Sequence, residues 1–480
     1  MSEKKEQFGH DANEDKPTYS CTEIGNMERF VDQHKDHLRS LGNSRVWLIW
    51  DGSRWKPSGY PEAFDYAIKT IYSISDEVKN ANSIQEAQMI QKWAVTSQSE
   101  AKTRAMMSMA ANHPDLLTSA SAFDKDKMKL NCLNGVVDLN TGKLLERDPS
   151  DLHTKLVKVK FDPDAKCPTF DKFLRGVFCH DHELLSWVQR AFGYTMTGSV
   201  QEQVLFICYG LGANGKSTLL ETISKILGDY STNVDFELFL TNQKSDVRIM
   251  EAVGEMKGIR LALASEVDST KRFNESLVKR LTGGDTLRGT KLHTGAFQFE
   301  PNHKLWFLTN HLPFARDGST GYWRRIKIIP FDAKFEGEAL DSTLSEKLWA
   351  EREGILAWLV RGAVNWSIRL RSTDGQSGLG SCEAVDRAVQ QYRLDNDHTT
   401  RFIDECLVLE DGVGNLGARE LYNAYQSWWR DNHDDEIPSE AIFGRRMEER
   451  GLKKRRTKAG FVYDNAKVVA SINYDLPYNF

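Results

Sequence analysis

Long apolar runs, paired cysteines and an apolar leader are missing from this sequence of 480 residues. Its apolar stretches, such as 204–209, are far shorter than the roughly 18 residues of a membrane-spanning helix. The first residues are mostly Lys, Glu, Asp and Asn, so we expect no signal peptide, no membrane attachment and a cytoplasmic protein. The seven Cys are scattered, odd in number and never spaced C-x-x-C, which argues against a disulfide framework and structural zinc.

Charge of one sign is not in large excess either. With 63 Lys and Arg against 68 Asp and Glu, the formal net charge is −5. That balance excludes a uniformly basic nucleic-acid coat protein but leaves room for local basic patches. The run Cys179-His-Asp-His-Glu183 contains metal-binding side chains, but no second cluster supplies the remaining ligands. The chain is long enough for about three domains, each with its own core.

Changes in residue pattern along the chain predict five segments. A charged, aperiodic tail that we expect to be disordered is followed by a mixed α+β domain, whose first hairpin turns on Asp51-Gly52 and whose default role is assembly. Alternating strands and helices then predict a mostly parallel sheet with helical flanks. A Gly- and Ser-rich linker with a helix leads to a last unit of helices and a basic hairpin. The segments span, in order, residues 1–25, 26–165, 166–370, 371–399 and 400–480.

The strongest local signal is a glycine-rich loop that begins at Gly210 and fits the pattern G-x-x-x-x-G-K-[ST] at every fixed position. An apolar run precedes it, and apolar residues at helical spacing follow it as far as Gly228. Strand, loop and helix are what phosphate binding needs, because turned backbone N–H groups and a helix N-terminus both favour an anion. The predicted site for ATP and Mg²⁺ comprises Gly210, Gly212, Ala213, Asn214, Gly215, Lys216, Ser217 and Thr218.

A phosphate loop needs an acid on a neighbouring strand, and the apolar run 259–264 leads to Glu266. We expect this carboxylate to polarise the attacking water and to help Ser217 hold Mg²⁺. Another apolar strand, from Lys304, ends at Asn310, whose amide could hydrogen-bond the γ-phosphate or the water. The pair Arg324-Arg325 precedes a third strand, and a guanidinium is suited to the charge that develops on a transferred phosphoryl group.

These motifs in this order resemble the superfamily 3 helicases, and most of all the phage and plasmid primase-helicases and the related poxvirus replicative NTPase. The shared series is the phosphate loop, the single-Glu strand, Leu-Thr-Gly-Gly-Asp at 281–285, the strand ending Thr-Asn and Trp-Arg-Arg-Ile at 323–326. Leu133-Asn-Gly-Val-Val-Asp138 and Glu420-Leu-Tyr-Asn-Ala-Tyr425 resemble flanking regions of the same family. The resemblance implies an α/β fold: a P-loop AAA+-like core with a mostly parallel sheet, an α+β N-terminal domain and a C-terminal winged-helix domain.

The resemblance also implies roles for single residues. Lys216 binds nucleotide, Glu266 is the Walker B acid and Asn310 is sensor 1. Many family members carry two adjacent acids where this chain has Ser265-Glu266, so the metal-holding and base roles stay undivided. No paired acids or zinc ligands for a primase domain are evident, and we expect a helicase with a separate primase as possible partner.

A ring is the second implication. Either Arg324 or Arg325 would be the arginine finger that reaches the ATP of the next subunit, and Lys279 and Arg280 would face the same ATP. The family precedent is a homo-oligomer, normally a hexamer, that translocates on and unwinds DNA in the replication of a phage, plasmid or other mobile element.

Two basic elements are candidates for contacts with single- and double-stranded DNA. The first is a predicted hairpin over 286–299, which resembles the family's central-channel hairpin and carries Arg288, Lys291 and His293. The second is a helix that Ser439 caps, with Ile442, Phe443 and Met447 expected to point inward, followed by a basic hairpin. Its candidate DNA-binding residues are Arg445, Arg446, Lys453, Lys454, Arg455, Arg456 and Lys458.

Other functions remain open at this point. An origin-binding or loader protein would use ATP to control assembly and would hydrolyse it without unwinding long duplex. A packaging or RNA-processing NTPase is a third possibility. The alternative for either basic element is ordinary solvated charge, and for the second also a partner-binding surface. An aromatic stripe at Leu421, Tyr422, Tyr425, Trp428 and Trp429 is expected to be core.

Overall fold

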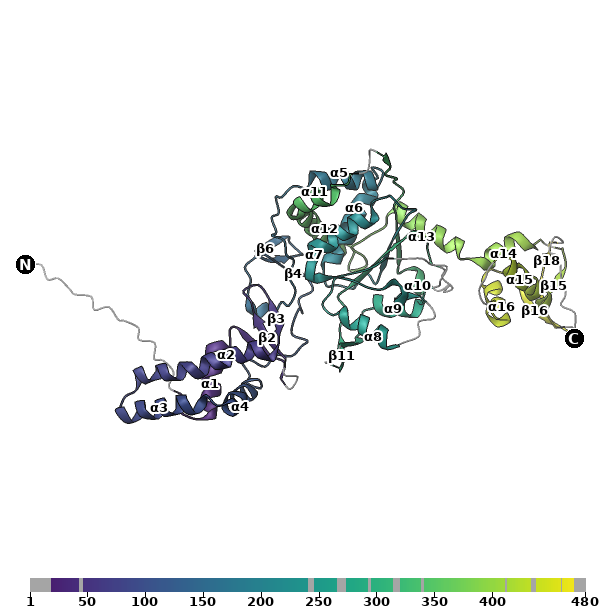
Figure 1. Cartoon of the computed structure of the whole chain (residues 1–480). Helices are drawn as coiled ribbons and strands as arrows, with labels where there is room; N and C mark the ends of the chain where they lie inside the picture. Colours follow the sequence, from purple (N-terminus) through teal and green to yellow (C-terminus); the bar gives the residue numbers. More distant parts are fainter. Residues whose placement is uncertain are drawn as a thin grey trace, which may run out of the picture. The chain divides into compact units, whose positions relative to one another are not determined.

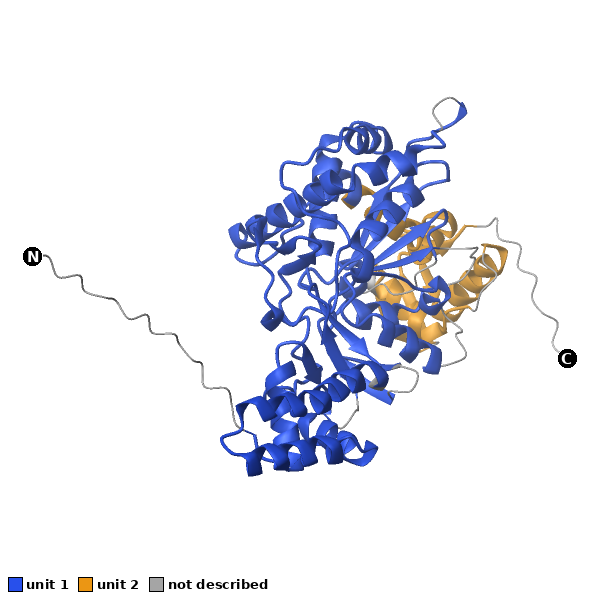
Figure 2. Cartoon of the chain, turned by 60° about the vertical axis from the view of Figure 1, so that its left-hand side comes forward, with its two compact units in different colours: residues 1–313, 320–385 blue, residues 314–319, 386–480 orange. Residues whose placement is uncertain are grey.

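The structure is a computed structural model, and it divides the chain into two compact units, residues 1–313 with 320–385 and residues 314–319 with 386–480 (Figure 2). No helix among the described residues is long and apolar enough to span a bilayer. The predicted tail 1–25 falls mostly outside those residues, and the first helix begins at Glu23. The structure describes residues 19–42, 46–240, 246–265, 273–291, 295–313, 320–337, 341–410, 412–432, 437–458 and 460–469.

Unit 1 begins with a group of helices and a small antiparallel sheet that share one core (Figure 1). The predicted turn at Asp51-Gly52 is confirmed, because β2 pairs with β3 and places Trp50 opposite Trp55. Thr22 caps the first helix by accepting a hydrogen bond from the backbone N–H of Gly25 at 3.1 Å. The elements are α1 (Glu23–His34), β1 (Leu38–Ser40), β2 (Trp47–Trp50), β3 (Trp55–Ser58), α2 (Tyr60–Ser73), η2 (Ile74–Asn80), α3 (Ile84–Ser97) and α4 (Glu100–Ala110).

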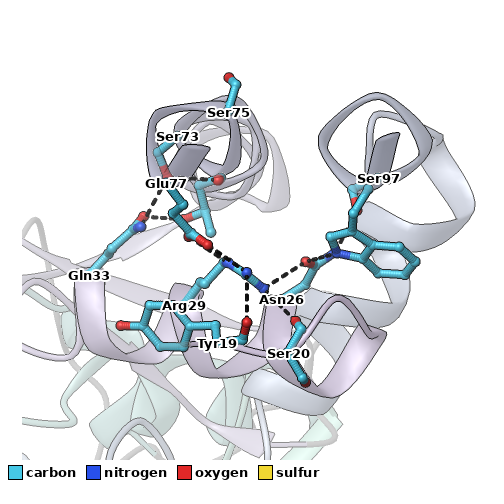
Figure 3. Close-up of polar contacts among 12 residues, drawn as sticks. Tyr19, Ser20, Asn26, Arg29, Gln33, Ser73, Ser75, Glu77 and Ser97 are labelled. Atoms are coloured by element: carbon cyan, nitrogen blue, oxygen red, sulfur yellow. Dashed lines mark hydrogen bonds and ion pairs between the residues drawn. The ribbon is translucent and has the colours of Figure 1, made fainter. Parts of the chain in front are cut away.

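A buried arginine joins these helices (Figure 3). The Arg29 side chain is fully buried, and its guanidinium donates two hydrogen bonds of 2.7 Å to the Glu77 carboxylate. It also donates to the backbone carbonyl of Ser20 at 2.9 Å. Asn26, one turn away on α1, donates to the Ser97 hydroxyl of α3 at 3.0 Å. A bidentate buried pair has a fixed geometry, so it holds the start of the described chain, α1 and η2 together.

The next segment of unit 1 packs into the same core as the central sheet, although we predicted it as part of the N-terminal domain. A three-stranded antiparallel sheet contributes Leu130 and Val137 to that core. The tip of the β2–β3 hairpin also contacts the 3-10 helix η4 (Gly228–Tyr230), since Arg54 forms an ion pair with Asp229. The elements of this segment are β4 (Lys129–Cys132), β5 (Gly135–Asp138), β6 (Lys143–Leu145) and η3 (Pro149–Asp151).

The predicted parallel sheet is confirmed. It has five strands in the order β13-β7-β12-β9-β8, and every neighbouring pair is parallel. Consecutive side chains of β12 point to opposite faces. Trp306 stacks on Phe192 at 4.1 Å between ring centroids, whereas Phe307 contacts Phe236 on the other face. Both faces are therefore covered. The strands are β7 (Leu205–Tyr209), β8 (Ser231–Asn233), β9 (Leu261–Ser265), β12 (Lys304–Thr309) and β13 (Ile326–Pro330).

Helices cover this sheet, and two of them pack very closely. A Cβ added to Gly193 would lie 2.0 Å from the backbone of Gly362, so α6 and α12 approach at residues that have no side chain. The predicted Gly- and Ser-rich segment has no helix or strand between 373 and 382, and it packs against the core through Leu379. The helices are α5 (Pro168–Val177), α6 (His182–Met196), α7 (Lys216–Leu227), η4 (Gly228–Tyr230), η5 (Phe236–Phe239), α8 (Asp246–Glu255), α9 (Glu275–Thr282), α10 (Thr320–Trp323), α11 (Leu344–Ala350), α12 (Arg352–Ser372) and α13 (Glu383–Asp395).

The hairpin predicted over 286–299 is present as β10 (Leu287–Lys291) and β11 (Gly295–Phe299), which pair antiparallel. It packs on α8 at two glycines. A Cβ added to Gly289 would lie 2.5 Å from the Cα of Gly254. The two elements therefore approach backbone to backbone, and this contact supports the base of the hairpin.

Unit 2 has its own core, in which Leu421, Tyr425, Trp428 and Trp429 are buried, so the aromatic stripe is core as predicted. One prediction fails here, because Ile442 does not point inward and is 39% exposed. It lies on the helix face away from Phe443 and Met447, which are buried. The elements are α14 (His398–Cys406), β14 (Leu407–Val408), β15 (Asn415–Gly417), α15 (Ala418–Asn432), α16 (Glu440–Glu449), β16 (Lys454–Thr457), β17 (Gly460–Asp464) and β18 (Lys467–Val468), with sheets β15-β17-β16 and β14-β18.

Candidate functional site

The glycine loop lies between the end of β7 and the start of α7, as its sequence predicts. Gly212, Ala213 and Gly215 have φ of 98°, 48° and 84°, in the left-handed region. Alternation of such residues with ordinary ones turns successive N–H groups toward one side and forms a concave anion site. A Cβ added to Gly215 would lie 2.9 Å from Val177, so the loop needs glycine there for space as well as for φ.

Lys216 is the first residue of α7 and is only 5% exposed. Its ammonium donates hydrogen bonds to the backbone carbonyl of Gly210 and, at 3.0 Å, to the side-chain oxygen of Asn310. Both acceptors are neutral, and no carboxylate in the described part of the chain pairs with it. Burial lowers the pKa of Lys216 below its ordinary value. A buried, uncompensated ammonium at a helix N-terminus favours an anionic ligand.

The strand order explains why Asn310 meets Lys216. β12 is the neighbour of β7 in the sheet, and the register places Thr309 opposite Tyr209. The carboxyl ends of parallel strands share one edge, so the residue after β12 lies beside the loop after β7. Ser217 is exposed on the first turn of α7 and Thr218 is half-buried.

The segment after β13 supports the loop from its other side, which the sequence did not indicate. The side-chain amide of Asn214, 3% exposed, donates to the backbone carbonyl of Phe331 at 3.1 Å. The backbone N–H of Phe335 donates to the carbonyl of Ala213 at 2.8 Å. These contacts join residues more than 110 positions apart, and no local pattern marks Phe331 or Phe335 as partners of the loop.

The predicted acid, Glu266, lies outside the described residues. The strand before it, β9, ends at Ser265, which is paired with Leu308 of β12. β9 therefore ends at the same edge of the sheet as β7 and β12, next to the strand that carries Asn310.

The two predicted arginines differ in their surroundings. Arg324 is exposed and donates to the Gln203 side-chain oxygen at 2.6 Å. Arg325 is half-buried and donates to the backbone carbonyl of Gly321. Burial, and then the neighbouring charge of Arg324, lower the pKa of Arg325. Arg324 is thus the more accessible guanidinium of the pair.

The other predicted residues in unit 1 lie on α9 and the β10–β11 hairpin. Lys279 and Arg280 occupy the last turn of α9, the first half-buried and the second exposed. Arg288 is exposed on β10. The side chain of Lys291 and all of His293 lie outside the described residues.

The predicted DNA-binding residues of unit 2 differ in whether an acidic side chain neutralises them. Lys454 lies 3.9 Å from the Glu448 carboxylate and Arg455 lies 2.6 Å from that of Asp464. Arg446 is half-buried on α16 and makes its own contacts. Of the predicted DNA-binding residues in this unit, Arg445, Lys453, Arg456 and Lys458 are exposed and have no acidic partner in the described part of the chain.

Comparison with known proteins supports this arrangement. The family described as "D5 N terminal like" matches residues 27–179, and a family of unknown function (DUF5906) matches residues 208–325. A protein named "Putative helicase" from Acanthamoeba polyphaga mimivirus is 26% identical over 339 residues, which cover 66% of this chain and 34% of the relative. The chain is therefore similar to proteins of the phage and viral primase-helicase type.

Further relatives carry similar names. A "Putative helicase" of Invertebrate iridescent virus 6 is 24% identical over 65% of this chain and 35% of its own length. A "Putative primase" of African swine fever virus is 21% identical over 65% and 34%. The chain spans about a third of the length of the curated relatives it matches. The solved apo structure of the NrS-1 C-terminal region is 11% identical, covers 92% of this chain and 98% of that one, and has a TM-score of 0.48.

Proposed function

We propose that this protein is an ATP-dependent DNA helicase of superfamily 3, which translocates on and unwinds DNA in the replication of a virus, phage or other mobile element. The observation that carries the proposal is the Lys216 ammonium. It is buried beside a concave turn of backbone N–H groups and pairs with neutral oxygens alone among the described residues. The charge is therefore available for the phosphates of ATP, which remove the cost of its burial.

Each residue around the loop has a proposed task in hydrolysis. The N–H groups of 213–216 bind the β- and γ-phosphates, and the dipole of α7 adds to their attraction. Ser217 would hold Mg²⁺, which supplies charge neutralisation at the phosphate oxygens when bound. Glu266 accepts a proton from the attacking water, and Asn310 orients that water or the γ-phosphate. Lys216 donates a hydrogen bond to the side-chain oxygen of Asn310. The amide N–H₂ of Asn310 would then donate toward the γ-phosphate.

Coupling to DNA is proposed to use the two basic elements. The β10–β11 hairpin would carry Lys291 and His293 to phosphates in a central channel, because a point charge grips the backbone without reading bases. Unit 2 would act as a winged helix that docks on DNA through α16 and the β16–β17 hairpin. Both elements fit the names of the viral relatives, helicase and primase.

The proposed assembly is a homohexameric ring in the host-cell cytoplasm. A finger from the next subunit would complete each nucleotide site, and the exposed guanidinium of Arg324 is better suited to that role than Arg325. Lys279 and Arg280 would lie at the same boundary.

The test is hydrolysis and strand separation by the purified chain on a forked DNA. Lys216→Ala removes the cation that neutralises the phosphates and should lower ATP hydrolysis roughly 10²–10³-fold. Lys225→Ala, at the exposed far end of the same helix, is the matched control and should hydrolyse like the wild type.

Two outcomes would change the proposal. Equal hydrolysis by the two variants would remove the glycine loop from the chemistry. Lys216-dependent hydrolysis without any separation of strands would favour the second candidate, an ATP-controlled origin-binding or loader protein.

A further inference from the structure

The β16–β17 hairpin of unit 2 has one face that begins in the core and ends in solvent. The antiparallel register pairs Lys454 with Tyr463 and Arg456 with Phe461. Side chains two positions apart on a strand share a face, as do directly paired residues, so all four lie on the same side of the hairpin. Tyr463 is 1% exposed in the core of unit 2. Phe461, at the outer end of this face, is 52% exposed.

Cations surround the exposed ring. The Lys454 ammonium lies 5.1 Å from the centroid of the Phe461 ring and 5.8 Å from that of Tyr463. Arg456 is the direct cross-strand neighbour of Phe461 and is exposed. On the opposite face of the hairpin, Arg455 is neutralised by Asp464 at 2.6 Å. The face that carries the aromatic ring therefore holds Arg456, which has no acidic partner in the described part of the chain, and Lys454, which lies 3.9 Å from Glu448.

This combination restricts the ligand. Phe461 leaves about half of its apolar surface in water, so this surface favours a flat apolar group. Arg456 and Lys458 have no acidic partner among the described residues and favour an anion next to that group. A nucleobase joined to its phosphates meets both requirements, through stacking on the ring and contacts to the cations. Duplex bases are already stacked on each other, so the base must be unpaired.

We infer that the face of the β16–β17 hairpin formed by Lys454, Arg456 and Phe461 binds an unpaired base of DNA, stacked on Phe461, with the flanking phosphates at Arg456 and Lys458. The inference rests on the proposed function, which makes DNA the ligand, and it adds that the bound DNA is single-stranded at this face. Unit 2 then recognises the junction between duplex and single strand rather than duplex alone.

The experiment uses the full chain and a forked DNA with 2-aminopurine at the first unpaired positions beside the junction. Stacking on an aromatic ring quenches this base, so wild-type protein should lower its fluorescence. Phe461→Leu keeps an apolar side chain without a π-face. It should lose the quenching and bind the fork about 5- to 100-fold more weakly, with binding to blunt duplex unchanged. Phe461→Trp should restore both signals.

Two further variants distinguish the contribution of charge to DNA binding from that of stacking. Arg456→Ala should keep the quenching but lower the slope of log affinity against log salt by about 0.7, as expected for one lost single-strand phosphate contact. Lys467→Ala, at an exposed cation on β18 outside this hairpin, should change neither signal. Circular dichroism checks that each variant is folded.

Failure of this inference differs from failure of the proposed function. Wild-type quenching and fork affinity in Phe461→Leu would overturn the stacking site and leave the exposed ring as a protein contact. In a second outcome, Phe461→Leu loses both signals but the wild-type chain does not hydrolyse ATP. This result would contradict the proposed helicase and support the base-binding site.

Discussion

Lys216 is buried by its neighbours without being neutralised by them. Its two acceptors, the Gly210 carbonyl and the Asn310 amide, are dipoles, and neither supplies a full negative charge. A carboxylate at either position would form an ion pair in the absence of ligand and would compete with a phosphate for the ammonium. Asn310 thus orients the cation while leaving its charge available.

Two substitutions at Asn310 should therefore impair different steps, turnover in one case and nucleotide binding in the other. Asn310→Ala removes the group that orients water or γ-phosphate, and we expect kcat to fall roughly 10²-fold with nucleotide affinity nearly unchanged. Asn310→Asp puts a carboxylate beside Lys216 and should weaken nucleotide binding itself. Titration with a fluorescent ATP analogue and steady-state hydrolysis measure the two effects. Equal nucleotide affinity in the two variants would contradict the role given to the neutral amide.

Among the elements proposed to contact DNA, the β10–β11 hairpin is the one whose base is held by close contacts with a neighbouring helix. Gly289 and Gly254 bring it against α8 backbone to backbone, and Lys257 lies 5.5 Å from the Phe297 ring on its second strand. We therefore expect the base of the hairpin to follow any movement of α8 during ATP hydrolysis. The strand that leads to the tip includes Lys291.

Replacing Lys291 and His293 together with alanine should therefore stop unwinding and leave hydrolysis and assembly intact, because the lost charges contact DNA and not ATP. Gln298→Ala is the matched control, since Gln298 is exposed on the same hairpin but carries no charge. Strand displacement on a fork and ATP turnover are measured side by side. Normal unwinding by the double variant would refute the hairpin assignment.

At the scale of the whole molecule, the proposed ring requires a residue that leaves its own subunit. Arg324 fits this requirement, because its guanidinium is exposed and, among the described residues, hydrogen-bonds to the neutral side chain of Gln203. Arg325 donates to the carbonyl of Gly321 one turn earlier and is half-buried. Replacing Arg325 should disturb the structure of its own segment, whereas replacing Arg324 should lower ATP hydrolysis at the site of the neighbouring subunit.

Mixing inactive subunits tests this difference. Arg324→Ala keeps an intact phosphate loop and Lys216→Ala keeps an intact finger, so a mixed ring contains some interfaces with both. We expect the mixture to recover part of the hydrolysis that each variant lacks alone. Mass photometry verifies that mixed oligomers form. Mixed rings that stay inactive would exclude a finger acting between subunits.

Local sequence alone determined the strand, glycine loop and helix around Lys216, the parallel strands, the turn at Asp51-Gly52 and the aromatic core of unit 2. These features follow from apolar spacing and from glycine's access to positive φ, which are properties of neighbouring residues. The same reasoning failed at Ile442, because helical spacing alone does not say how wide the buried stripe of α16 is.

Only the tertiary structure decided which distant residues meet. The order β13-β7-β12-β9-β8 brings Asn310 to Lys216 and the carbonyl of Phe331 to Asn214, across about a hundred residues each. It also separated basic residues that look alike in the sequence: Arg455 pairs with an acid, whereas Arg456 lies beside an exposed ring. Strand order, side-chain exposure and ion pairing depend on how whole segments pack, because a side chain's neighbours in space are mostly not its neighbours along the chain.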